Sequence, residues 1–283
     1  MNPANPLSLA QLPDAVAPAA TGPGTLVNVS AIAGVSLREL ARRKDFYVLF
    51  VLTALITLVM GSVNVFNQDG IVRYLKEFCL FLIWASSLVI TVTATARQLP
   101  AERENRTLFP LLAKPVTRSE VVTGKFLGCW IASGIALLVF YTFFGLMAAI
   151  QERHWPVAHH LQALTLHWAA LGIVGAMAML GSVVFAAPSS NNTITLVVAA
   201  AILYLGGHLN KVALRLTEPG QTILQAVYFT LPHLEWFDLR SLIVHEGALV
   251  PWTVWAAALA YAGAYTAFFL AIACLLFRRK AVN

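Results

Sequence analysis

The chain has 283 residues, of which 59% are hydrophobic and only 11% are charged. A soluble globular protein carries about 25% charged residues, so this composition excludes a soluble enzyme, a disordered protein and a disulfide-held scaffold. The net charge is +6, but no basic stripe is interleaved with aromatic side chains, which argues against a nucleic-acid partner. The composition is that of an all-α, multi-pass membrane protein.

The chain opens with a segment that predicts no packed structure. Residues 1–27 are rich in Pro, Ala, Gly and Ser, and we expect a disordered cytoplasmic tail. From Asn28 to Lys44 the apolar residues Ile32, Val35 and Leu40 share one helical face, with Arg and Glu largely off it. This pattern predicts an amphipathic helix in the headgroup layer, at the start of a transmembrane domain covering residues 28–283.

Six later stretches are long and apolar enough to cross about 30 Å of hydrocarbon. A polar run that begins at Pro188 separates the fourth from the fifth, and we expect a tight turn there. The six predicted spans are Phe46–Phe66, Phe78–Ala96, Phe126–Ile150, Leu164–Ala187, Thr193–Leu209 and Trp252–Phe277.

The basic residues predict the orientation of these spans. With the N-terminus in the cytoplasm, thirteen of the 19 Lys and Arg residues fall on the cytoplasmic side, as the positive-inside rule requires. The protein is then expected in the cell (inner) membrane, with both termini in the cytoplasm. The connection 97–125 becomes a cytoplasmic loop, and the segment 208–250 becomes extracytoplasmic, as one or two short helices on or in the outer leaflet.

The loop 97–125 combines charge with a small apolar ridge. Glu102 and Arg106 are four residues apart, a spacing that pairs them on a helix. Leu108, Leu111 and Leu112 recur at helical spacing, and Pro115 ends the helical part with a rigid corner. Two interpretations remain: a docking surface for another protein, or a solvated loop that only orients the spans.

The sequence from Glu102 to Arg118, with the Gly-Lys pair that follows, resembles the permease subunits of type-2 ABC transporters. The matching positions are Glu102, Glu104, Arg106, Thr107, Leu108, Leu111, Leu112, Pro115, Val116, Arg118, Gly124 and Lys125. Arg106 stands where the family often has glycine, and Pro110 interrupts a usually continuous coupling helix. In weaker form the resemblance covers about residues 30–283.

The resemblance implies a permease that works as a dimer, with an identical or a paralogous copy, beside two separate ATPase subunits. ATP and magnesium would bind to those subunits, because this chain lacks the GxxxxGK[ST] phosphate loop. We therefore expect no catalytic residue, cofactor or metal in this chain. The expected ATPase-coupling residues are Glu102, Glu104, Arg106, Thr107, Leu108, Leu111, Leu112, Pro115 and Arg118.

Few ionisable residues lie within the predicted spans. His167 is the best candidate for a role in transport, although its position near the outer end of the fourth span also allows a solvated side chain. Gly124 and Gly128 form a GxxxG pattern, which favours close helix packing within one subunit or across a dimer. No polar constellation identifies the substrate. The sequence therefore predicts an ABC exporter permease, and the alternative is an ATPase-independent secondary transporter or channel.

Overall fold

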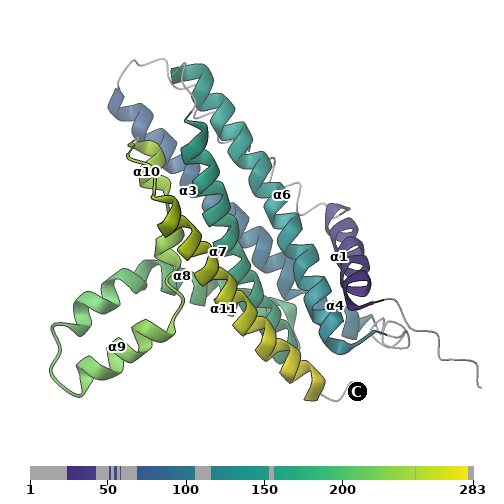
Figure 1. Cartoon of the computed structure of the whole chain (residues 1–283). Coiled ribbons are helices and arrows are strands. Elements are labelled where there is room, and N and C mark those ends of the chain that lie inside the picture. Colours follow the sequence, from purple (N-terminus) through teal and green to yellow (C-terminus); the bar gives the residue numbers. More distant parts are fainter. Residues whose placement is uncertain are drawn as a thin grey trace, which may run out of the picture.

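The computed structural model describes residues 24–42, 51, 54–55, 58, 69–105, 116–152, 156–245 and 247–279. Every regular element in these residues is helical, as the composition predicts. The order is α1 (Thr25–Ala41), α3 (Asp69–Ala96), α4 (Gln98–Glu104), α6 (Arg118–Glu152), α7 (Val157–Val184), α8 (Pro188–Ala213), α9 (Gly220–Thr230), the 3-10 helix η2 (Leu234–Phe237), α10 (Arg240–Val244) and α11 (Trp252–Arg279) (Figure 1).

Five of the described segments are long and apolar enough to span a membrane. They are Lys76–Glu104, Arg118–Ala149, Val157–Val184, Pro188–Gly206 and Trp252–Arg279, and they match the second to sixth predicted spans in order. The first predicted span, Phe46–Phe66, lies almost wholly outside the described residues, so six spans remain a prediction.

The predicted turn between the fourth and fifth spans is wrong in its position. The chain is non-helical only at residues 185–187, and Pro188 is the first residue of α8. Proline is well tolerated at a helix start, because the N–H that it lacks would have no partner within the helix there. The polar residues after Pro188 therefore form the first turn of α8, where buried Asn191 donates a hydrogen bond to the carbonyl of Ala178 on α7 (2.9 Å).

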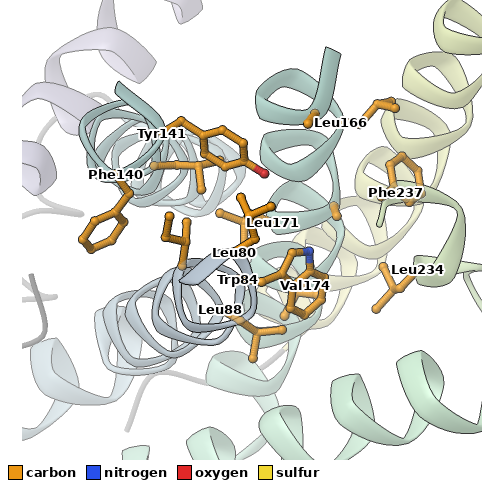
Figure 2. Close-up of a cluster of buried hydrophobic side chains, with 14 of the residues drawn as sticks. Leu80, Trp84, Leu88, Phe140, Tyr141, Leu166, Leu171, Val174, Leu234 and Phe237 are labelled. Atoms are coloured by element: carbon orange, nitrogen blue, oxygen red, sulfur yellow. The ribbon is translucent and has the colours of Figure 1, made fainter. Parts of the chain in front are cut away.

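The apolar core lies between α3, α6 and α7, and it is closed at one end by η2 and α10 (Figures 1 and 2). Helix α7 occupies the centre of the bundle, whereas α11 packs along it and leaves most of its own surface exposed. Side chains labelled in Figure 2 that fill this core are Leu80, Trp84, Leu88, Phe140, Tyr141, Leu166, Leu171, Val174, Leu234 and Phe237.

Helices α6 and α7 are joined by a pair of tryptophans, which we call the tryptophan clasp. The indole N–H of Trp130 donates to the carbonyl of Trp168, and that of Trp168 donates to the carbonyl of Trp130, each over 3.0 Å. The two rings stack with centroids 4.4 Å apart. Glycine makes room for them: a methyl group added at Gly134 would lie 2.5 Å from Trp168 Nε1, and one added at Gly172 would lie 3.1 Å from Trp130 Nε1.

Helix α1 packs lengthwise against the first part of α6, in the same direction. Ile32 lies against Gly124, and Ala33 and Ser36 lie against Gly128. The GxxxG glycines thus serve packing within one subunit, one of the two interpretations left open by the sequence. The buried stripe of α1 is Asn28, Ile32, Ala33, Ser36 and Leu40.

The sequence-based description of α1 needs two corrections. The helix begins at Thr25, so residues 25–27 belong to it and not to the predicted tail. Val35 is 65% exposed, although it was expected to share the apolar face of Ile32 and Leu40. The polar Ser36 occupies the contact with Gly128 because its small side chain permits the close approach.

Candidate functional site

The predicted coupling residues that the structure describes lie at one end of the bundle, which we call the α4 end. Glu102 and Glu104 are on α4, and Arg118 is the first residue of α6. The other six predicted residues lie outside the described part of the chain and remain predictions: Arg106, Thr107, Leu108, Leu111, Leu112 and Pro115.

Glu102 pairs with a residue that local sequence spacing does not suggest. Its Oε1 lies 2.7 Å from Nζ of Lys125, on the second turn of α6. Lys125 is only 4% exposed, and its ammonium also donates to Oε1 of Gln98 over 3.2 Å. Gln98 and Glu102 are one helical turn apart on α4, so both contact the same amine. The sequence feature that could have indicated this contact is Lys125 itself, a single lysine directly before the apolar span that begins at Phe126.

A polar cavity of about 220 Å³ adjoins this ion pair. Its walls come from α1, α4 and α6 and from the residues flanking α4. This space separates Glu39 of α1 from the Gln98 and Glu102 side chains of α4. The lining residues are Glu39, Arg97, Gln98, Ala101, Glu102, Asn105 and Lys125.

Arg118 joins the start of α6 to the end of α11. Its guanidinium donates to the carbonyl oxygens of Phe277 (3.0 Å) and Arg278 (3.2 Å) and lies over the ring of Phe277, 5.8 Å from its centroid. The last carbonyls of a helix have no partner within the helix, so a cation that binds them stabilises the helix end. In return, Arg278 donates from Nε to Oγ of Ser119 over 3.1 Å.

The start of α6 also carries a capping box, which the sequence analysis missed. The backbone N–H of Thr117 donates to Glu120 Oε2 over 2.7 Å, and the N–H of Glu120 donates to Thr117 Oγ1 over 3.3 Å. The Thr-x-x-Glu spacing ahead of an apolar run was the available signal. Glu120 also accepts hydrogen bonds from the Thr25 and Asn28 side chains of α1. The starts of α1 and α6 and the end of α11 therefore meet at the α4 end.

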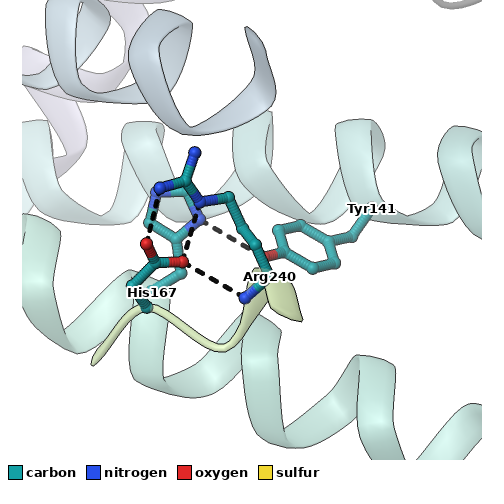
Figure 3. Close-up of polar contacts among 4 residues, drawn as sticks. Tyr141, His167 and Arg240 are labelled. Carbon is teal, nitrogen blue, oxygen red and sulfur yellow. Dashed lines mark hydrogen bonds and ion pairs between the residues drawn. The ribbon is translucent and has the colours of Figure 1, made fainter. Parts of the chain in front are cut away.

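A second polar cluster lies among the apolar side chains around His167 (Figure 3). His167 is 1% exposed, so the expectation of a solvated side chain is wrong. One ring nitrogen is 2.9 Å from Ser87 Oγ and the other is 3.4 Å from the hydroxyl of Tyr141, while the ring stacks on Trp84. These contacts link α3, α6 and α7. His167 is buried because η2, α10 and their flanking residues cover this end of α7, which hydropathy placed near water.

Beside this cluster, Asp238 and Arg240 form a two-pronged ion pair with distances of 2.6 and 2.8 Å. Burial alone would raise the pKa of the Asp238 carboxyl, but the hydrogen bonds and charge of Arg240 outweigh it and hold the pKa below its ordinary value. The guanidinium of Arg240 also lies over the Phe81 ring, 5.4 Å from its centroid. The pair thereby fixes the loop before α10 against α3. Among the described residues, no three His, Cys, Asp or Glu side chains gather closely enough to hold a metal ion.

Comparison with known protein families identifies a family of membrane transporters, in agreement with the candidate membrane spans. A model of the family described as ABC-2 family transporter protein matches residues 30–282, which is nearly the whole chain. No protein with a curated description matches the chain. The match extends from α1 to the end of α11, and thus includes the α4 end and all five candidate spans. This multi-pass integral membrane protein therefore belongs to the ABC-2 family of transporter proteins.

Proposed function

We propose that this chain is the permease subunit of an ABC exporter, which moves an unidentified substrate across the cell membrane. The energy comes from ATP hydrolysed by a separate ATPase subunit that docks on the loop 97–125. The family match over residues 30–282 carries this proposal, together with the lack of a phosphate loop in the sequence. ATP and magnesium belong to the partner subunit, and a second permease copy completes the transporter.

The arrangement of the α4 end supports a cytoplasmic position for the loop and for both termini. The start of α1 contacts Glu120, and the end of α11 contacts Arg118 and Ser119, so the two ends of the described chain lie together. Chain ends on one side fit an even number of spans, which the predicted first span would complete. Basic residues gather at this end, as expected of the cytoplasmic face.

The described contacts also explain how such a loop would act on the bundle. It contains α4 and the start of α6, and the Lys125 and Arg118 bonds tie these helices to each other and to α11. A motor that moves the loop would therefore act on several spans together.

The test is purification of the chain in mild detergent from its own cells, followed by identification of the nucleotide-binding subunit that accompanies it. We expect Leu111→Asp to abolish that association while membrane insertion persists, because a charge replaces an apolar side chain of the docking ridge. The control is Leu214→Asp, the same change at an exposed leucine of the segment 208–250. Recovery of the ATPase with Leu111→Asp at the wild-type yield would contradict docking on this loop. Transport by the purified chain without any ATPase would favour a secondary transporter or channel.

A further inference from the structure

The ion pair at the α4 end joins α4 directly to α6. Helix α4 has only seven residues, and Leu99 is its fully buried apolar side chain. Leu99 packs in a cluster with residues of α6, α7 and α11. Apolar contacts of this kind are not directional, so they allow a helix to slide or rotate. Helix α4 continues α3 through Arg97 and is joined to α7 by Arg103, which donates to the Val183 carbonyl over 3.5 Å. Its directional link to α6 comes from the polar contacts of Lys125.

Lys125 supplies these contacts through a single amine. Its Nζ binds Glu102 at 2.7 Å and Gln98 at 3.2 Å, two positions on one face of α4. A charge this deeply buried is costly unless it stays paired and hydrogen-bonded. The pair therefore resists separation, and a displacement of α4 has to carry the second turn of α6 with it.

The polar cavity lies between the face of α4 that carries Gln98 and Glu102 and Glu39 of α1. The cavity has a volume of about 220 Å³, and Glu39 of α1 lines it together with Gln98 and Glu102 of α4. A displacement of α4 is resisted at α6 by the Lys125 bonds and at α7 by the Arg103 bond to the Val183 carbonyl. Helix α1 packs on α6 at Gly124 and Gly128, and its Leu40 also clusters with Ala94 of α3.

From this geometry we propose that Lys125 is a positioning residue for transport, which with Glu102 and Gln98 couples movement of α4 to α6. This inference rests on the proposed function, because it takes an ATPase on the loop 97–125 as the source of movement. The movement that nucleotide binding causes in α4 is transmitted to the spanning part of α6 through the Lys125 amine.

The experiment compares amide hydrogen exchange in the purified permease–ATPase complex with and without ATP and vanadate. In the wild type we expect a nucleotide-dependent change both in residues 98–104 and in residues 126–149. In Lys125→Met we expect the first change to persist and the second to be lost, with the ATPase still bound. Reversing the pair, with Glu102→Lys and Lys125→Glu together, restores the second change, a rescue that a merely structural role does not predict.

The matched control is Glu39→Gln, which removes a charge from the opposite wall of the cavity and leaves both Lys125 bonds in place. It should respond as the wild type does. Should Lys125→Met fold poorly, Glu102→Gln keeps the side-chain volume and the Gln98 bond, and it should weaken the response of residues 126–149. A wild-type response in both variants would overturn the inference. A wild-type chain that binds no ATPase would instead refute the proposed function, and the inference with it.

Discussion

Replacing Gly134 by alanine tests the packing of the tryptophan clasp. The added methyl group would lie 2.5 Å from Nε1 and 2.7 Å from Cε2 of Trp168, far closer than van der Waals contact. The ring cannot yield without losing its stacking and its hydrogen bond to the Trp130 carbonyl. Overpacking of this kind costs about 1–3 kcal/mol. Against this, alanine gains roughly 1 kcal/mol over glycine within a helix. We expect a net loss of about 1 kcal/mol.

The effect of Gly134→Ala on stability should reverse its sign when the Trp168 ring is absent. In a Trp168→Ala background the methyl group meets no indole, so Gly134→Ala should stabilise by roughly 1 kcal/mol. A matched control is Gly263→Ala on α11, where an added methyl group meets nothing within 4 Å. Unfolding by sodium dodecyl sulfate in mixed micelles, followed by circular dichroism, measures all three differences in stability. A stabilising or neutral Gly134→Ala in the wild-type background would refute the packing argument.

Three further predictions concern the contacts of the other elements. Gly128→Val brings a branched side chain against the Ala33 carbonyl, 2.7 Å from the added Cβ, so limited proteolysis within residues 24–42 should accelerate, whereas Gly34→Val should not change it. Glu120→Ala removes half of the capping box and should lower helix stability by about 1 kcal/mol, measured as faster amide exchange in residues 116–124. Since the pKa of Asp238 is lowered in the folded state, its contribution is complete above about pH 4 and is lost as the pH falls through the lowered value. Asp238→Asn should therefore flatten the acid side of the stability profile, and an unchanged slope would contradict the role of the Arg240 pair.

The spanning helices were the predictable part of the fold. A run of apolar residues is a local property, so hydropathy located the second to sixth predicted spans and ended the second at Ala96, where α3 ends. Helix ends set by capping were harder to predict. The Thr117–Glu120 box starts α6 eight residues before the predicted span, and Pro188 begins a helix where it was expected to break one.

The partners of the site residues could not be predicted, because they are set by tertiary packing. Spacing along a helix suggested Arg106, which lies outside the described residues, as a partner of Glu102. It gave no sign of the pair that Glu102 forms with Lys125 on a different helix. Likewise, small residues at Gly124 and Gly128 predicted a close approach but did not identify α1 as the helix that approaches. The coverage of His167 by the segment after α9 depends on how that segment folds back, which no local pattern encodes.

The contact between α1 and α6 also bears on how the protein is made. During synthesis α1 leaves the ribosome long before Gly124 and Gly128 have been translated, so its buried stripe has no partner while the early spans enter the bilayer. Docking of the N-terminal helix is thus a late event in biogenesis. A ribosome-stalled intermediate that ends before α6 should expose Asn28–Leu40 to chaperones or proteases, and release of the full chain should hide it.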